Sequence, residues 1–437
     1  MTSVIPSAST YVLAHARVAV ALVAAPGLAA DADGLAACEI EIRDGRIFDI
    51  APPRASPPSA ETPRADLRGG LVLPRFVDGH THLDKGHILG RAPNPDGTFL
   101  GARTAVMADR AANWSADDVR RRMDFALRSA FAHGTSAIRT HIDSLGPQTA
   151  ISWPVFDEIR QAWKGRIELQ AAALCPTEMA VDDAAQFDTI VATVARYGGS
   201  IGGLSYMGTQ PGEKLDRALD RVCEAAAANG LGLDFHVDES SDPDAVTLEP
   251  IARAVIRNKF RGAVVAGHCC SLALASDEDR RRIVDRVGEA GIAVVSLPLV
   301  NLYLQDRTAG RTPRWRGVVP VHELAAAGVP VFVASDNTRD PFYAYGDLDF
   351  LEVFREATRI LHLDHSRRNW AELLGPTPAH ALGFVTSGKL AVGGPADMVI
   401  TDARNWWELS ARPWSDRTVL LAGQPIERTL PDYRELD

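Results

Sequence analysis

Two hydrophobic patterns divide the chain. Short β-like stretches separated by turns lie near both ends, whereas the middle repeats an apolar run rich in β-branched residues followed by a longer amphipathic segment. Buried parallel strands that alternate with surface helices produce this repeat. Eight such units predict an α/β fold, a closed (β/α)8 barrel of the TIM type. The predicted strands lie at residues 71–77, 136–141, 167–174, 201–207, 231–236, 263–268, 292–300 and 329–334.

Helix start and stop signals frame the segments between these strands. Ser115 with Asp118 three residues later is a typical helix start, and Gly134 is a typical helix end. Ser276 with Asp279 repeats the pattern further along the chain. We expect these amphipathic helices to pack around the outside of the barrel. The apolar face of the first helix is formed by Val119, Met123, Ala126, Leu127 and Ala130.

The two chain ends carry the shorter β-like stretches. Asp44-Gly45 is a typical turn between two strands, and the Pro- and Ala-rich residues 52–63 are expected to form a loop, because proline cannot donate to a strand ladder. The simplest arrangement joins both ends in one small β-sandwich domain beside the barrel. We therefore predict the N-terminal part of this domain at residues 1–70, the barrel at residues 71–385 and the C-terminal part at residues 386–437.

Composition and charge narrow the class of function. The 437 residues are 46% hydrophobic and 23% charged, as in ordinary globular proteins. A formal net charge of -10 argues against nucleic-acid binding, which needs clustered Lys and Arg to neutralise phosphates. The expected partner is a small molecule. A barrel of this size with acid-rich flanks is also expected to form a homo-oligomer.

The sequence further predicts a location in the cytoplasm. The apolar residues 16–30 are interrupted by Arg17, Pro26 and Gly27 and follow no cluster of positive charge, so they do not predict a secretory signal. No other run approaches the roughly 20 apolar residues that span a bilayer. The five cysteines are odd in number and lack a C-x-x-C spacing, which predicts neither a disulfide framework nor a zinc ribbon.

Histidines gather at the carboxyl ends of the predicted strands. His80 and His82 close the first strand two residues apart, so both imidazoles point to the same face. His236 ends the fifth strand, His268 ends the sixth, and Asp336 follows the eighth. The carboxyl ends of barrel strands all open on one face. Neutral imidazoles with a carboxylate suit a divalent ion that keeps an open position for catalysis, so the sequence predicts a metal site there.

Two further residues near these strand ends are candidates for the same site. His141 ends the second predicted strand and is predicted to contact substrate or to support a metal ligand. Lys85 follows the histidine pair and is predicted either to contact substrate or to pair with a neighbouring acid. The other histidines are expected to be surface or packing residues: His15, His87, His133, His322, His362, His365 and His380.

Several motifs resemble the amidohydrolase superfamily, and in particular its cytosine deaminase branch. FVDGHTHLD at residues 76–84 resembles the strand-one signature, and HVDE at residues 236–239 resembles the strand-five motif. HLDK at residues 82–85 is also similar to N-isopropylammelide isopropylaminohydrolase, a triazine-processing relative. Further similar segments are LVNLYLQ at 299–305, ASDN at 334–337 with DPF at 340–342, DGRI at 44–47, GKL at 388–390 and GPADMVI at 394–400, so the resemblance runs from about residue 40 to residue 402.

The resemblance implies one divalent metal ion, zinc or iron. Relatives with two metals use a carboxylated lysine at the end of strand four, where this chain reads SYMG at residues 205–208 and has no lysine before Lys214. One ion is therefore favoured over two. The implied ligands are His80, His82, His236 and Asp336.

The resemblance also implies a division of roles around the ring that reacts. Metal-bound hydroxide attacks a ring carbon, and Glu239 carries a proton to the adjacent ring nitrogen. His268 and Asp336 position and deprotonate the water. A nearby acid is chemically required, because attack at an amidine-like carbon builds charge on the ring nitrogen.

Departures from the cytosine deaminase pattern affect the substrate. Thr177 stands where the branch has a glutamine that reads the pyrimidine, and a hydroxyl cannot copy the paired donor and acceptor of an amide. Asn337 replaces a second aspartate, and Phe342 replaces a tryptophan. All three are candidate substrate contacts, and free cytosine is not predicted as the substrate. The Pro- and Gly-rich residues 87–101 are expected to form a loop over the pocket that sets substrate choice.

The sequence thus predicts a metal-dependent hydrolase that removes an amino or alkylamino group from a nitrogen heterocycle. A first alternative is hydrolysis of a ring amide by the same metal site, as in cyclic amidases. A second is a catalytically inactive binding scaffold, which the intact set of histidines and acids disfavours.

Overall fold

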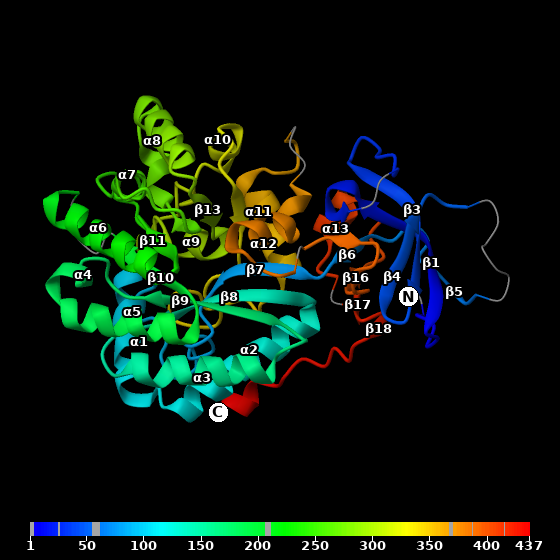
Figure 1. Cartoon of the computed structure of the whole chain (residues 1–437), viewed down its shortest axis with the longest axis horizontal. Helices are drawn as coiled ribbons and strands as arrows, with labels where there is room; N and C mark the ends of the chain where they lie inside the picture. The colour runs from blue at the N-terminus through cyan, green and yellow to red at the C-terminus, as the bar shows by residue number, and fades with distance from the viewer. Residues whose placement is uncertain are drawn as a thin grey trace.

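The fold is a barrel with smaller sheets beside it (Figure 1). A computed structural model describes residues 4–24, 27–54, 62–205, 211–366, 370–386, 388–414 and 416–437. Eight neighbouring strands, paired in parallel, follow one another around the barrel in chain order. The predicted (β/α)8 barrel is therefore confirmed. The strands are β7 (Phe76–Thr81), β8 (Thr135–Asp143), β9 (Glu168–Leu174), β10 (Ser200–Ser205), β11 (Gly232–Val237), β12 (Val264–His268), β13 (Ala293–Ser296) and β14 (Val331–Val333).

The first and last strands close the barrel through residues that the sequence singled out. Thr81 at the end of β7 forms a parallel bridge with Asp336 just beyond β14. The backbone N–H of Asp336 donates to the carbonyl of His80 at 2.8 Å. Backbone pairing thereby fixes two of the predicted metal ligands beside one another.

The predicted first strand at residues 71–77 is wrong as a single element. Val72–Pro74 forms β6, which pairs with β16 (Met398–Ile400) in a flanking sheet. The barrel strand β7 begins only at Phe76, after Pro74 and Arg75. Both halves are fully buried, so hydrophobicity alone gives no sign of the change of sheet.

The predicted seventh strand at residues 292–300 is also too long. The strand β13 ends at Ser296, and the chain turns at once into α9 (Pro298–Leu304). Proline at the first position of a helix loses no hydrogen bond, because that N–H has no partner within the helix. The early turn brings Asn301 to the mouth of the barrel.

Helices cover the outside of the barrel. The predicted caps are confirmed: Ser115 accepts from the backbone N–H of Asp118, Gly134 ends the same helix in a left-handed conformation, and Ser276 accepts from the N–H of Asp279. No helix in the described ranges is long and apolar enough to cross a bilayer. The helices are α1 (Phe99–Asn113), α2 (Ala116–His133), α3 (Gln148–Ala162), α4 (Met179–Asp182), α5 (Ala184–Tyr197), α6 (Glu213–Ala228), α7 (Leu248–Arg257), α8 (Asp277–Glu289), α10 (Val321–Ala326), α11 (Phe350–Leu361), α12 (Pro376–Leu382) and α13 (Trp406–Ala411).

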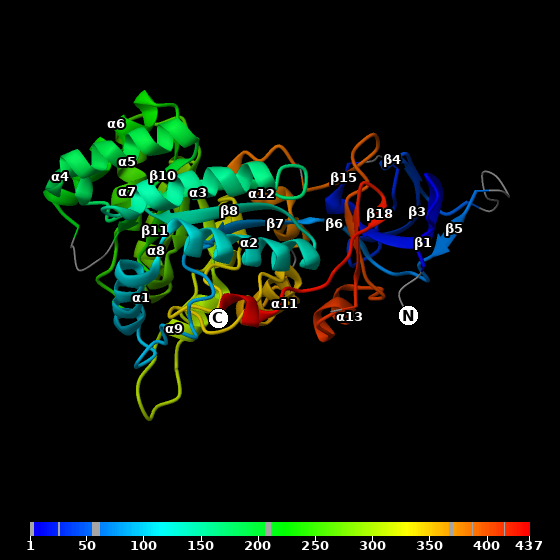
Figure 2. The same cartoon turned by 90° about the horizontal axis from the view of Figure 1, so that it is seen from below.

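Strands from both chain ends form separate sheets beside the barrel, as Figure 2 shows. The exact domain limits at residues 70 and 385 stay a prediction. Two predicted features lie partly outside the described residues: the loop at 52–63, at residues 55–61, and the end of strand four, at residues 206–210. The flanking strands are β1 (Thr10–Ala19), β2 (Val23–Ala24), β3 (Leu35–Arg43), β4 (Arg46–Ala51), β5 (Arg64–Asp66), β6, β15 (Leu390–Ala391), β16, β17 (Thr418–Leu421) and β18 (Gln424–Pro425).

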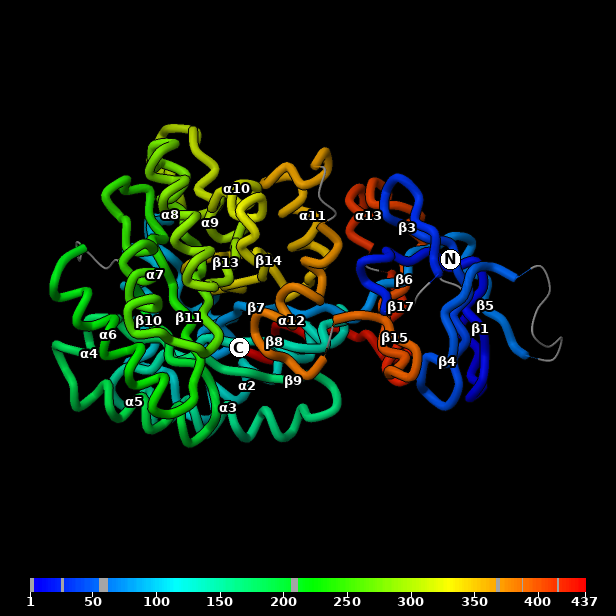
Figure 3. Tube along the Cα trace, turned by 45° about the horizontal axis from the view of Figure 1, so that its top comes forward, coloured from blue at the N-terminus to red at the C-terminus, as the bar shows by residue number. Residues whose placement is uncertain are grey.

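A buried ion pair joins the flanking sheets to the barrel. Arg417, just before β17, donates to both carboxylate oxygens of Asp349, at 2.6 and 2.5 Å. Asp349 also caps α11 by accepting from the N–H of Leu351 at 3.0 Å. The last residues then return along the barrel, and Glu435 near the C-terminus meets Arg128 of α2 at 2.6 Å (Figure 3).

We predict that Asp349→Asn lowers the free energy of unfolding by about 3 kcal/mol, because it leaves the buried guanidinium of Arg417 without a carboxylate while keeping the helix cap. Burial by itself would raise the pKa of Asp349, but the charge and hydrogen bonds of Arg417 lower it below its ordinary value. The stabilisation is therefore complete above the pKa of an unfolded aspartate and is lost as the pH falls through the lowered value. Urea unfolding at neutral and acidic pH measures both effects.

The matched control is Glu408→Gln, which breaks an exposed pair with Arg404 in place of a buried one. It should change the stability much less, because water screens exposed pairs. An Asp349→Asn protein as stable as the wild type at neutral pH would contradict the role of the ion pair.

Candidate active site

The four predicted metal ligands and His268 meet at one mouth of the barrel. His82 Nε2 lies 3.2 Å from His236 Nε2 and 3.1 Å from Asp336 Oδ1. His80 Nε2 lies 3.6 Å from the same Asp336 oxygen. The ring of His268 is centred 5.0 Å from the ring of His236. Side chains from β7, β11, β12 and the segment after β14 thus converge on one point.

Sharp backbone turns aim these side chains. His268 and Asp336 adopt left-handed conformations, with φ of 67° and 63°, where their strands end. Asp238, with φ of 47°, follows His236 and accepts three hydrogen bonds from Thr247, at 2.6 to 3.0 Å. Such conformations persist in non-glycine residues only where surrounding contacts hold them, and they are common at functional sites.

Burial keeps the imidazoles neutral. It is the largest cause that lowers the pKa of His80, His82 and His236 well below the ordinary value, and it lowers the pKa of His268 to about 3. Neutral imidazoles offer a lone pair to a metal ion, whereas protonated ones do not. The histidines are therefore in the form that a ligand requires.

The donor set fits a cation. Buried polar atoms normally have hydrogen-bond partners, and each exception calls for a physical reason. Three-residue groups with ligand atoms within 4.8 Å of one another include His80, His82 and Asp336, and also His80, His236 and His268. Several atoms of these residues are buried and lack partners in the described ranges, namely His80 Nε2, His82 Nδ1, His236 Nδ1, His268 Nε2 and both carboxylate oxygens of Asp336.

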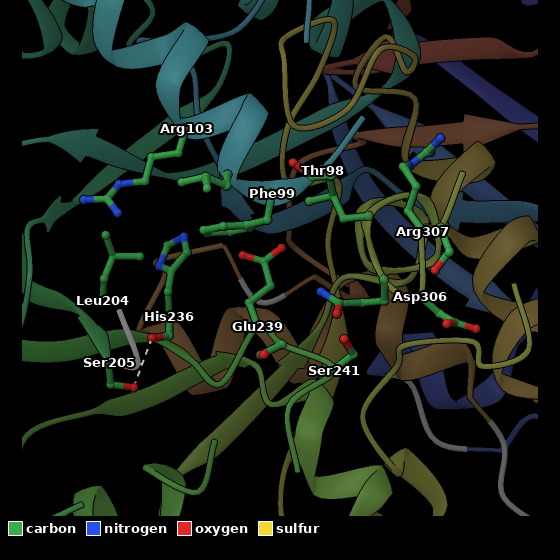
Figure 4. Close-up of a pocket in the computed structure, with 15 residues that line it drawn as sticks. Thr98, Phe99, Arg103, Leu204, Ser205, His236, Glu239, Ser241, Asp306 and Arg307 are labelled. Carbon is green, nitrogen blue, oxygen red and sulfur yellow. Dashed lines mark hydrogen bonds between the residues drawn. The ribbon is translucent and has the colours of Figure 1, made fainter. Parts of the chain in front are cut away.

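Glu239 stands beside this cluster at the cavity wall. Its Oε1 is 3.4 Å from His268 Nδ1, and Asn301 Nδ2 lies 3.4 Å from that oxygen and 3.0 Å from that nitrogen. Burial, then the negative charge of Asp336, raises the pKa of Glu239 well above the ordinary value. Figure 4 shows Glu239 and His236 pointing toward Phe99 of α1. A carboxyl with a raised pKa can hold a proton at a higher pH than an ordinary glutamate.

An inner cavity of about 120 Å³ adjoins the cluster. Phe99 and Phe342 line it and meet edge to face, with ring centroids 5.3 Å apart. Lys85 and Asn337 supply polar groups in the same lining. A larger outer cavity of about 610 Å³ shares Phe99 and Glu239 with the inner one and continues toward solvent. Aromatic walls with a few polar groups suit a planar heterocycle.

Buried hydrogen bonds hold the segment that carries Lys85. Arg122 of α2 donates to the carbonyl of Asp84 and, at 3.3 Å, to that of Gly86. The carboxylate of Asp84 accepts from the backbone N–H of Asp143 at 2.8 Å. Lys85 Nζ therefore lies inside the cavity, 3.9 Å from Asp143 and 5.1 Å from the ring centre of Phe342. The predicted pairing of Lys85 with a neighbouring acid is therefore present, and a contact with substrate stays a prediction.

Two comparisons decide the family. A model of the amidohydrolase family matches residues 178–424. Pterin deaminase of Rhizobium rhizogenes is 55% identical over 433 residues, which are 99% of this chain and 97% of the relative. The chain belongs to the amidohydrolase family.

Solved structures of other amidohydrolases agree with the fold. 5-Methylcytosine deaminase from Klebsiella pneumoniae, liganded with phosphonocytosine, superimposes with a TM-score of 0.81 at 25% identity, over 95% of this chain and 98% of the other. N-isopropylammelide isopropylaminohydrolase from Burkholderia multivorans gives a TM-score of 0.71 at 26% identity, over 96% and 98%. The predicted family and its cytosine deaminase-like branch are confirmed.

Not every predicted substrate contact lies in the cavity of this amidohydrolase. Asn337 and Phe342 line it, and Asn337 donates to Asp340 at 2.6 Å. The hydroxyl of Thr177 instead donates to the carbonyl of Leu204 at 3.0 Å, and Pro176 lines the cavity beside it. The structure therefore supplies no support for a substrate contact from Thr177. His141 lies beside His80, with His141 Nε2 3.1 Å from His80 Nδ1.

The sequence predicted no role for several residues at the cavity or beside Glu239. Asn301 lay inside a motif that the sequence resemblance singled out, but no role followed from it. Arg110 of α1 pairs with Asp143 at 2.7 Å, and both line the inner cavity. The predicted loop at residues 87–101 is wrong at its end, because α1 begins at Phe99 with Thr98 as its cap. An amphipathic helix gives no local sign that it covers an active site.

Lys214, the first lysine after strand four, is remote from the metal cluster. It lies on α6, and its ammonium group contacts Asp182 at 2.7 Å. It therefore lines neither the inner nor the outer cavity.

We predict that Gly267→Ala weakens metal binding about tenfold, the low end of effects seen when groups supporting a metal ligand are changed. A Cβ at this position of β12 would lie 3.1 Å from Cε1 and 3.3 Å from Nδ1 of His80, so the ring must shift. Metal content after dialysis against a chelator measures the effect. The control is Gly288→Ala in α8, where a Cβ meets no atom closer than 3.8 Å. Equal metal retention in both variants would contradict the tight fit around His80.

Proposed function

We propose that this amidohydrolase is a metal-dependent deaminase that replaces the amino group of a pterin-like heterocycle by an oxo group. The observation that carries the proposal is the placement of Glu239, a largely buried acid 3.4 Å from His268 at the edge of an aromatic cavity. The pterin deaminase relative, similar over nearly the whole chain, supports the substrate class. Phe99 and Phe342 give the cavity aromatic surface against which a fused bicyclic ring can pack.

His80, His82, His236 and Asp336 would hold one zinc or iron ion, because neutral nitrogen donors with one carboxylate suit such metals. A divalent ion bound there supplies hydroxide near neutral pH by lowering the pKa of water from 15.7 to about 7. The remaining chemistry falls to side chains. Asp336 and His268 orient the attacking water and accept its proton.

Glu239 carries the protons that the ring nitrogen and the leaving amino group require. Its protonated carboxyl donates to the ring nitrogen next to the carbon under attack, which neutralises the charge that builds there. Asn301 lies within hydrogen-bonding distance of both Glu239 and His268 and so fixes the two side chains relative to one another. Glu239, now ionised, takes the proton of the new hydroxyl on that carbon and passes it to the amino nitrogen. The bond between carbon and the amino nitrogen then breaks, the carbon keeps an oxo group, and ammonia leaves. The proton that Asp336 and His268 took from water returns to Glu239 and completes the cycle.

The proposal includes a location in the cytoplasm. All five cysteines are free and buried, which fits a reducing cytoplasm. The homo-oligomeric state stays a prediction.

Incubation of the metal-quantified protein with pterin should release one ammonia for each oxo product formed. Free cytosine and N-isopropylammelide serve as comparison substrates, and both are expected to react more slowly, because neither fills a site built for two fused rings. Enzymatic ammonia detection with mass spectrometry of the ring product measures the reaction. A ring-opened product without ammonia would favour the cyclic amidase alternative and contradict the proposal.

Glu239→Gln should lower kcat by about 10²- to 10⁴-fold, the usual contribution of a general acid, while leaving the metal content unchanged. In the wild type, kcat/KM should fall as the pH rises through the raised pKa of Glu239, because only the protonated carboxyl can donate. Rates and metal content measured from about pH 5 to about pH 10 test both points. The control is Glu224→Gln on the exposed face of α6. Undiminished turnover in Glu239→Gln would remove its role as proton carrier.

A further inference from the structure

A fifth imidazole lies beneath the proposed metal ligands and takes no part in the reaction described above. His141, near the end of β8, is fully buried, and its ring centre lies 4.0 Å from that of His80 and 4.5 Å from that of His236. Its Nε2 is 3.1 Å from His80 Nδ1, within hydrogen-bonding distance. One of these two nitrogens must therefore carry the shared proton.

We propose that His141 is the positioning residue of the metal site: its Nε2 accepts the Nδ1 proton of His80 and thereby leaves His80 Nε2 free to bind the ion. This inference rests on the metal site of the proposed function. In the opposite tautomer His80 would carry its proton on Nε2, the atom that lies 3.6 Å from Asp336, and could not be a ligand through it. The partner of the second ring nitrogen commonly fixes the tautomer and the orientation of a metal-binding histidine.

Beside His141 lies a layer of buried side chains, and Asp234 Oδ1 of this layer is 3.6 Å from His141 Nε2. Arg139 precedes His141 by two residues on β8, so both point into the barrel. Arg139 donates to Asp234 Oδ2 at 3.0 Å, to Gln170 Oε1 at 2.7 Å and to the carbonyl of Leu382 at 2.9 Å. Asp234 in turn precedes His236 by two residues on β11. The layer thus ties the strand of His141 to the strand of His236.

His80, His141 and Asp234 do not form a good second metal site. Their ligand atoms do lie within 4.8 Å of one another. However, the carboxylate of Asp234 is already neutralised by the buried guanidinium of Arg139. A further cation there would face that positive charge in a region closed to water, where like charges repel strongly. The arrangement favours one ion above His141 over a second ion beside it.

Two substitutions distinguish the loss of the hydrogen-bond acceptor from a change in side-chain volume at this position. His141→Met keeps a similar volume but replaces the ring nitrogen by a thioether, which accepts hydrogen bonds only weakly, whereas His141→Gln places an amide oxygen near the position of Nε2. The Zn²⁺ dissociation constant of each apo-protein is measured by competition with a chromophoric chelator, and Co²⁺ absorption reports on the coordination. We expect His141→Met to bind Zn²⁺ about 10- to 100-fold more weakly and His141→Gln to recover most of the loss. The control is His322→Met, at a histidine that bonds the carbonyl of Leu361 away from the site.

The outcomes distinguish this inference from the proposed function. Circular dichroism of the apo-proteins should show unchanged folding, because an apolar side chain at a buried position is tolerated. Zn²⁺ binding as tight in His141→Met as in the wild type would overturn the inference alone, and so would equal weakening by Met and Gln. Two zinc ions per wild-type chain would overturn it in favour of the second site. A wild-type chain that binds no divalent ion would overturn the proposed function as well.

Discussion

The lone pairs of His80, His82, His236 and Asp336 converge where the protein excludes water. Buried polar atoms without partners are unfavourable, and this cluster concentrates several of them at one point. The barrel tolerates the arrangement because backbone pairing between β7 and the segment after β14 fixes the strand ends regardless of the side chains. A cation at this point would satisfy His80 Nε2 and the carboxylate of Asp336, and it would also bind His82 Nε2 and His236 Nε2, which lie 3.2 Å apart. The backbone turns and hydrogen bonds around the mouth of the barrel hold these side chains in place.

Burial also accounts for the protonation states of both the proposed metal ligands and the acid beside them. The burial that disfavours the charged form of the imidazoles likewise disfavours the charged form of Glu239. One physical cause thus yields ligands with free lone pairs and a carboxyl that keeps its proton. Asn301 connects the two groups, since its amide lies within 3.4 Å of both Glu239 and His268. Opening this region to water would weaken both properties together.

The substrate side of the site is built from elements outside the barrel strands. Phe99 comes from α1, Lys85 from the loop before it, and Phe342 from the loop after β14. Buried hydrogen bonds such as those of Arg122 hold these segments against the barrel. Loops and short helices on a fixed barrel can vary without disturbing the metal cluster, which is how one scaffold serves different heterocycles.

The sequence by itself determined the barrel, the helix caps at Ser115 and Gly134, and the identity of the residues at the strand ends, because strand period, capping and strand direction are local properties of the chain. It did not separate β6 from β7, since both are equally apolar and the choice of sheet depends on β16, more than 300 residues away. Only the tertiary structure turned Thr177 toward Leu204, placed Asn301 between Glu239 and His268, and set His141 beneath His80. These outcomes depend on distances and burial summed over segments far apart in sequence, which no local pattern records.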